Sequence, residues 1–319
     1  ITSTGDSNVK AGTVMGTIGA AGQPTTANGE TKTGGMSVSA TVAENDVKSN
    51  GTVITTIYGR QGTANGMLAV DGGSYDNYPI EEGVAYAAPA AGYKIEANED
   101  GTYGVVVDPA YGKVAKVGDE YFATLQEAIN AAQNDETVVL LNTITLADAD
   151  MVKTEDNRNV MLNISNKSIT LDLNENTINI DYNGGQYLFA AVYVADGAGL
   201  TVTGNGKIDI AENGINVAYM FWKRGTTGYL TIENGTFHMD DSGDSMVYTN
   251  GDEIVTVNGG TFTIDNIDTR PNQFPCIFNA AGQNTANIIV NGGTFNDDVA
   301  HQYYPFEVMM SREKALKKS

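Results

Sequence analysis

The chain has 319 residues with a formal net charge of −21, a balance that would repel nucleic acid and anionic membrane surfaces. Its length suits one large all-β domain or two smaller ones. One cysteine excludes an internal disulfide, and no stretch approaches the roughly eighteen apolar residues of a membrane span. We expect no nucleic-acid partner and no direct membrane insertion.

The first part of the chain carries turn-forming residues and short β-prone runs. Residues 1–50 are rich in Gly, Thr, Ser, Ala and Asn, and solenoid rungs, a thin β domain and an extended arm all fit them. QGTANGMLAVDGGSYDN (61–77) reads like QNTANIIVNGGTFND (283–297), and the alternation about NEDG within 92–108 predicts a hairpin. Residues 51–108 are therefore predicted as the terminal rungs and hairpin of a first β-helix module, in a longer tandem array.

A change of period follows within residues 115–146. Leu125, Ala128, Ile129 and Ala132 fall at i, i+3, i+4 and i+7, which predicts a short α-helix near 124–133. Thr124 and Glu127 have the spacing of a capping box. Because the first turn of a solenoid exposes a sheet edge, we assign this helix as the N-terminal cap of a second module spanning 109–319.

The second module repeats one short motif. LTIENGTF (230–237), VTVNGGTF (255–262) and IIVNGGTF (288–295) are close copies, and ITLDLNENTI (169–178) and LTVTGNGKI (200–208) are weaker ones. Repetition at 25 to 33 residues indicates a solenoid in which each repeat stacks on the previous one. Alternation predicts one inward column, formed by Ile178, Ile208, Phe237, Phe262 and Phe295.

VGDEYFATLQEAINAAQNDETVVLL, followed by ITLDLNENTI and repeated NGGTF, resembles the pectate-lyase-like right-handed parallel β-helices of bacterial surface proteins and bacteriophage virion proteins. The resemblance covers roughly residues 110–310. It implies an all-β, right-handed parallel β-helix located extracellularly, on a bacterial cell surface or a phage virion, and homotrimers are frequent among the phage members. The superfamily includes polysaccharide lyases, hydrolases, tailspikes and adhesins. Sequences with the NGGTF form resemble the adhesins, which lack known catalysis.

An acidic loop beside a cationic pair is the candidate catalytic set. The resemblance to lyases implies that Asp240, Asp241 and Asp244 hold calcium while Lys223 or Arg224 removes a proton from a uronate. A solvated loop explains the same acids. A glycoside hydrolase would instead need two carboxylates about 5–10 Å apart, and outward acids are available at Asp172, Glu233, Asp265 and Asp268.

The run AYMFWKRGTTGYL (218–230) has the most unusual composition in the chain. Tyr219, Phe221, Trp222 and Tyr229 are its candidate binding residues, because exposed aromatic rings beside polar groups suit sugar stacking. Strict alternation predicts Tyr219 and Phe221 on one face, with Met220 and Trp222 on the other. The alternative is that one pair fills the core and the other covers the base of a loop.

The leading hypothesis is a non-enzymatic module that acts as a rigid spacer and binds a glycan or another surface protein. Its rivals are a polysaccharide lyase or glycoside hydrolase and a virion or filament subunit docked through residues 1–50. The chain has two histidines without zinc-ligand spacing, so calcium is the one candidate cofactor. The isolated Cys276 lies among apolar neighbours, which predicts a buried thiol.

Overall fold

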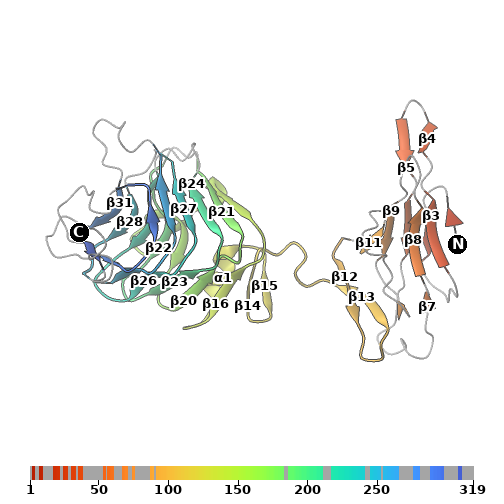
Figure 1. Cartoon of the computed structure of the whole chain (residues 1–319), viewed down its shortest axis with the longest axis horizontal. Helices are drawn as coiled ribbons and strands as arrows, with labels where there is room; N and C mark the ends of the chain where they lie inside the picture. The colour runs from red at the N-terminus through yellow and green to blue at the C-terminus, as the bar shows by residue number, and fades with distance from the viewer. Residues whose placement is uncertain are drawn as a thin grey trace. The chain divides into compact units, whose positions relative to one another are not determined.

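The computed structural model describes residues 91–182, 186–210, 217–240, 245–252, 254–265, 276–280 and 288–297, and the backbone of strands β1–β11 and β34 outside these ranges. The chain divides into two compact units, Ile1–Gly112 and Lys113–Ser319 (Figure 1). No helix within the described part is long and apolar enough to cross a membrane.

The first unit contains short strands that pair mainly in parallel. β2, β6, β9 and β11 form one parallel ladder, β1, β3 and β8 form another, and β7 pairs with β10, whereas β4 and β5 are antiparallel. This pairing is what solenoid rungs produce, and it draws on strands both before and after residue 50. The bounds are β1 Thr2–Ser3, β2 Ser7–Val9, β3 Thr17–Ala21, β4 Pro24–Ala27, β5 Glu30–Thr33, β6 Gly35–Val38, β7 Val53–Ile54, β8 Thr56–Arg60, β9 Met67–Val70, β10 Ser74–Tyr75 and β11 Ala87–Pro89.

A hairpin ends the first unit, as the sequence predicts. β12 (Tyr93–Ala97) and β13 (Tyr103–Val107) pair antiparallel. The turn is closed by the Asn98 N–H, which donates to the Thr102 carbonyl at 2.7 Å. Gly101 has φ +83°, a conformation that glycine adopts without steric cost.

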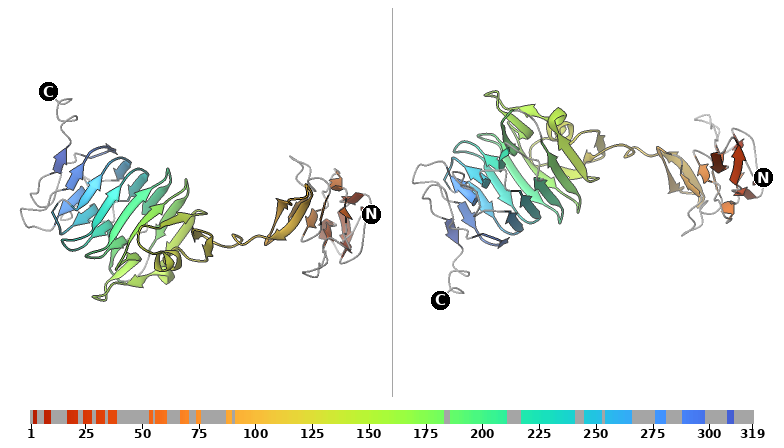
Figure 2. Two further views of the ribbon diagram at one scale, coloured as in Figure 1. Left: turned by 90° about the horizontal axis from the view of Figure 1, so that it is seen from below. Right: turned by 90° about the horizontal axis from the view of Figure 1, so that it is seen from above.

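The second unit is a β-solenoid whose strands stack into three ladders (Figure 2). Sheet 1 is β15-β14-β16-β20-β23-β26-β29-β32-β34, sheet 2 is β17-β21-β24-β27-β30-β33, and sheet 3 is β18-β19-β22-β25-β28-β31. Each full turn adds one strand to each sheet, for example β20, β21 and β22. The predicted all-β solenoid is confirmed, and it is consistent with a parallel β-helix.

The strand bounds follow the three sheets. Sheet 1 has β14 Ala115–Val117, β15 Glu120–Phe122, β16 Thr137–Leu140, β20 Ser168–Asp172, β23 Gly199–Thr203, β26 Tyr229–Ile232, β29 Val255–Val257, β32 Ile288–Val290 and β34 Val308–Met310. Sheet 2 has β17 Ile144–Ala147, β21 Thr177–Asp181, β24 Lys207–Ile210, β27 Thr236–Met239, β30 Thr261–Ile264 and β33 Thr294–Phe295. Sheet 3 has β18 Val152–Lys153, β19 Asn159–Ile164, β22 Leu188–Val194, β25 Val217–Lys223, β28 Ser245–Thr249 and β31 Cys276–Ala280.

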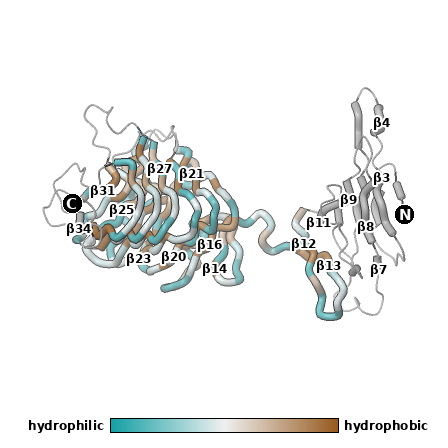
Figure 3. Tube along the Cα trace, in the orientation of Figure 1, coloured by the Kyte–Doolittle hydropathy of each residue, from teal (hydrophilic) through white to brown (hydrophobic). Residues whose placement is uncertain are grey.

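The predicted inward column is confirmed residue by residue. Ile178 pairs with Ile208, Ile208 with Phe237, Phe237 with Phe262, and Phe262 with Phe295. The Phe237 and Phe262 rings stack with centroids 4.9 Å apart, and Phe262 and Phe295 follow at 5.3 Å. Hydrophobic and hydrophilic stretches alternate along the turns (Figure 3), because successive residues of a strand face opposite sides of the sheet.

The asparagine and glycines of the repeat build the corner. Gly235, Gly260 and Gly293 have φ values of +123°, +101° and +120°, a region that other residues rarely adopt. Across one corner, the Asn291 Nδ2 donates to Asn258 Oδ1 at 2.9 Å. Corner geometry and core stacking therefore explain the motif as scaffold.

The first turn of the solenoid is covered by a helix and a hairpin. The helix α1 (Leu125–Ala131) begins with the predicted capping box between Thr124 and Glu127, and it buries Leu125, Ala128 and Ile129. The short 3₁₀ helix η1 (Asp148–Asp150) follows later in that turn. The helix alone was expected to protect the exposed edge, but β14 and β15 also pair antiparallel beside β16. Sequence reasoning missed this hairpin.

Candidate functional site

Lys223, a candidate base, is fully buried at the end of β25. Its Nζ donates to the carbonyls of Ala195, Arg224 and Thr227 at 2.8, 2.7 and 2.8 Å. Burial lowers the pKa of this ammonium group to about 8, against the opposing effect of the Asp196 charge. With its three protons on carbonyls, Lys223 ties two loops together, and it presents no surface to a substrate.

The structure does not bring Lys223 to Asp240. Lys223 pairs with Thr249 at the end of β28, whereas Asp240 follows β27 and precedes β28 in the chain. The Asp240 N–H donates instead to the Ile210 carbonyl at 3.1 Å, at the end of sheet 2. Asp240 is itself 6 % exposed, and Asp241 and Asp244 lie outside the described residues.

The outward carboxylates have separate structural partners. Asp172 Oδ1 accepts from the Asn174 N–H at 2.8 Å, Glu233 Oε1 accepts from Asn258 Nδ2 at 3.0 Å, and Asp265 contacts His238. Asp268 lies outside the described part of the chain. Within that part, no group of three or more His, Cys, Asp or Glu side chains could hold a metal ion. Cys276 is buried, as predicted.

The alternation predicted for the aromatic run is wrong. Tyr219 and Trp222 share one surface, with ring centroids 6.0 Å apart, while Met220 and Phe221 are both buried. Ala190 pairs with Tyr219 and Val192 with Phe221, in one constant register along the strand. Met220 and Phe221 are consecutive, yet both lie in the core, where the Phe221 ring lies edge-on to Phe237. Phe221 therefore has no surface to offer a ligand.

The outward aromatic residues line a groove of about 380 Å³, which we call the arginine groove. Its floor is the Trp222 indole, only 5 % exposed, whose Nε1 donates to Asn250 Oδ1 at 3.2 Å. Tyr187, at 45 % exposed, is the most exposed aromatic residue of the groove. Tyr229, in contrast, lies on sheet 1 and does not line the groove. The lining residues are Arg158, Tyr187, Phe189, Tyr219, Trp222, Arg224, Gly225, Tyr248 and Asn250.

A tight turn between β18 and β19 places Arg158 at the groove. The Thr154 N–H donates to the Arg158 carbonyl at 2.9 Å, and Thr154 Oγ1 accepts from the Arg158 N–H at 3.0 Å. Asn157 adopts φ +65° within this turn, which asparagine tolerates better than most residues. The Arg158 guanidinium then lies 4.6 Å from the Phe189 ring centroid and 5.2 Å from that of Trp222.

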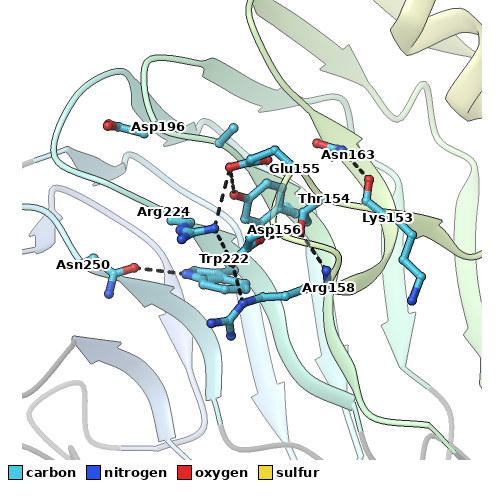
Figure 4. Close-up of polar contacts among 12 residues, drawn as sticks. Lys153, Thr154, Glu155, Asp156, Arg158, Asn163, Asp196, Trp222, Arg224 and Asn250 are labelled. Carbon is cyan, nitrogen blue, oxygen red and sulfur yellow. Dashed lines mark hydrogen bonds and ion pairs between the residues drawn. The ribbon is translucent and has the colours of Figure 1, made fainter.

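One carboxylate holds both arginines (Figure 4). Asp156 Oδ2 accepts from Arg158 Nε at 2.8 Å and forms an ion pair with Arg224 Nη1 at 2.7 Å, while its Oδ1 accepts from Thr154 Oγ1 at 2.6 Å. Burial raises the pKa of Asp156, but the hydrogen bonds from Thr154 and Arg158 and the two arginine charges outweigh it and lower the pKa to about 2. Asp156 therefore stays ionised at any physiological pH.

A second loop places Arg224. Asp196 Oδ1 accepts from the N–H groups of Thr226 and Thr227 at 3.1 and 2.9 Å, and from Thr227 Oγ1 at 2.7 Å. Gly225 has φ +78°, and a Cβ there would lie 2.2 Å from the Asp196 carboxyl carbon. The Arg224 guanidinium lies 5.9 Å from the Trp222 ring centroid. The loop is thus built closely around a glycine next to the groove.

Glu155 and Tyr193 complete the support behind Arg224. The Tyr193 hydroxyl donates to Glu155 Oε1 at 2.9 Å, and that oxygen lies 3.6 Å from Arg224 Nη1. Burial, with a smaller contribution from Glu155, raises the pKa of Tyr193 to about 12. The phenol is therefore neutral and holds Glu155 as a hydrogen-bond donor.

Sequence reasoning found Tyr219, Trp222 and Arg224 but missed the other side chains of the groove. A detectable signal was the repeat register, because Tyr193, Trp222 and Tyr248 pair in successive turns. Aligning the copies through this strand as well as through NGGTF would have gathered these aromatic residues into one column. Arg158 had no such signal, because it follows a turn in the first rung.

The fold defines the chain as a β-solenoid, consistent with a parallel β-helix. No family model, curated protein or solved structure matches it.

Proposed function

We propose that this chain is a non-enzymatic, pectate-lyase-like β-helix module displayed outside the cell, on a bacterial surface or a phage virion. It acts as a rigid spacer and presents the arginine groove to a surface glycan. The observation that carries this proposal is the different use of the two neighbouring cations. Lys223 donates its three hydrogen bonds to carbonyls inside the fold, whereas Arg224 lines the groove.

The role of rigid spacer is supported by the continuity of the ladders and the core. Sheets 2 and 3 each continue through six strands, and their inward side chains belong to one buried cluster. Because each turn is hydrogen-bonded to the next, bending the rod would break several backbone hydrogen bonds at once. Such a rod holds its groove at a defined distance from its point of attachment.

The glycan-binding role is supported by the mixture of groups in the groove. Aromatic walls and a few polar groups are the usual composition of a small-molecule site. Trp222 is covered too well to act as a stacking platform, so we assign stacking to Tyr187 and hydrogen bonding to Asn250 and the arginines. The trimeric state suggested by the sequence resemblance stays a prediction for a size measurement.

A glycan array tests the binding role, with the full chain and its Tyr187→Ala variant as probes. Binding by the wild type and its loss in the variant support the groove as the site. A conservative Tyr187→Phe variant should retain most of the signal, since it keeps the ring. Equal binding by all three proteins would contradict the assignment of stacking to Tyr187.

An activity assay tests the non-enzymatic character. We expect no unsaturated products from polygalacturonate or other acidic polysaccharides, with or without calcium. Release of such products by the wild type, abolished in Asp241→Ala, would overturn the proposal in favour of a lyase. Release of saturated oligosaccharides would instead favour a hydrolase.

A further inference from the structure

The charge of the groove differs from that of the chain around it. The full chain carries 39 acidic and 18 basic residues, yet the described residues that line the groove include two arginines and no acidic residue. Both arginines whose side chains the structure describes, Arg158 and Arg224, are in this lining. This concentration of cations on an acidic chain indicates an anionic group in the ligand.

The carboxylates near the arginines hold them from outside the lining. Asp156 takes Nε of Arg158 and Nη1 of Arg224, so one negative charge is shared between two positive ones. Glu155 contacts Arg224, whereas Asp156 is the one carboxylate paired with Arg158 among the described residues. The two carboxylates thus balance the two guanidinium charges, and Arg158 shares only one of these carboxylates, Asp156.

Arg158 is also positioned to donate. Its Nε is bound to Asp156, and its guanidinium rests against the Phe189 and Trp222 rings. Its terminal nitrogens make no hydrogen bond to any described residue. A guanidinium fixed along one edge and stacked on rings loses little entropy on binding, and its other edge matches a carboxylate in a two-point contact.

Building on the proposed function, we infer that the groove binds the carboxylate of a terminal acidic sugar, with the Arg158 guanidinium as its main partner and Tyr187 against the sugar ring. The two guanidinium groups meet at one place, because both contact the same oxygen, Asp156 Oδ2. A polyuronate chain would instead need cations repeated along the rod, and the described residues offer no such row. The geometry therefore favours a single terminal carboxylate over a row of internal ones.

Calorimetric titration of the full chain tests this inference with 3′-sialyllactose, lactose and galacturonate oligomers. We expect sialyllactose to bind at least about tenfold more tightly than lactose, the usual scale of a hydrogen bond to a charged group. Arg158→Gln should remove this preference, and Arg158→Lys should remove most of it, because a lysine lacks the planar fork. Lys207→Gln, which removes a positive charge from sheet 2, is the matched control and should leave the affinities unchanged.

The outcomes separate this inference from the function on which it rests. Equal affinity for lactose and sialyllactose would overturn the acidic class while leaving the groove a glycan site. Affinity that rises with each added galacturonate would overturn the terminal position. No binding of any sugar would overturn the proposed function as well. The melting temperature of each variant should stay within about 2 °C of the wild type, so lost binding is not lost folding.

Discussion

The phenylalanine column of sheet 2 and the arginine groove beside sheet 3 belong to one solenoid, yet they obey different rules. In the column, equivalent residues of successive copies meet one another, so each position is explained by its neighbours in the stack. In the groove, Arg158 and Arg224 come from loops of unequal length and meet around Asp156. The column thus follows the repeat throughout, whereas the two arginines of the groove depart from it.

The strongest way to break this comparison is to remove a ring from the column. Phe262 is fully buried between Phe237 and Phe295, so Phe262→Ala should lower the free energy of unfolding by about 3–5 kcal/mol. Denaturant unfolding measures this change. Thr231→Ala, at an outward position of β26, is the control and should cost about 0.5 kcal/mol or less. Similar costs for the two variants would contradict the assignment of Phe262 to a packed column.

The second largest effect is expected at Lys223, which lies between core and groove. Lys223→Met keeps the stem of the side chain but leaves three carbonyls without their donor, so it should cost about 3 kcal/mol. Lys207→Met is the control, because Lys207 forms a partly exposed ion pair with Asp209, which contributes about 1 kcal/mol or less. If Lys223→Met were as mild as this control, the ammonium group would not be the tie between the two loops.

Much of the scaffold follows from the sequence, because its contacts are local or repeated. A short local pattern is enough to predict the capping box of Thr124 and the turn before β13. A repeated pattern is enough to predict the column through Phe262. The groove does not follow in this way. Its geometry depends on the burial of two consecutive residues, Met220 and Phe221, and on the register that sets Tyr193, Trp222 and Tyr248 side by side.

A smaller effect is expected where Asp156 positions the arginines. Asp156→Asn keeps the shape but removes the charge that holds both guanidinium groups, so it should cost about 1 kcal/mol of stability. Binding of the acidic sugar should weaken through lost positioning, although removal of a negative charge alone would strengthen it. Tighter binding by Asp156→Asn would show that local charge matters more than the placement of the arginines.

The smallest expected effect concerns His238 on the outer face of sheet 2. Its ring contacts Asp209 Oδ1 at 2.6 Å and Asp265 Oδ2 at 3.1 Å, from the turns before and after it. Burial lowers the pKa of His238, but these two carboxylates outweigh burial and raise it above the usual value. Since the folded state holds the proton more tightly, the ring stabilises the fold fully below about pH 6.5.

That stabilisation should be lost as the pH rises through the raised pKa of the folded state. We expect a decrease of about 1 kcal/mol or less, since the side chain is partly exposed. His238→Gln should remove this pH dependence, as measured by urea unfolding at a series of pH values. If the wild-type stability instead rose with pH across the same window, the assignment of His238 as a histidine held between two aspartates would be contradicted.

The separation of scaffold from site is tested most directly by measuring melting temperature and sugar affinity on the same two variants. Arg158→Gln should lose the preference for 3′-sialyllactose over lactose at an unchanged melting temperature. Phe262→Ala should melt well below the wild type yet bind the sugar with unchanged affinity at a temperature where it is folded. A variant that lost both properties together would contradict the account, because column and groove would then be one unit.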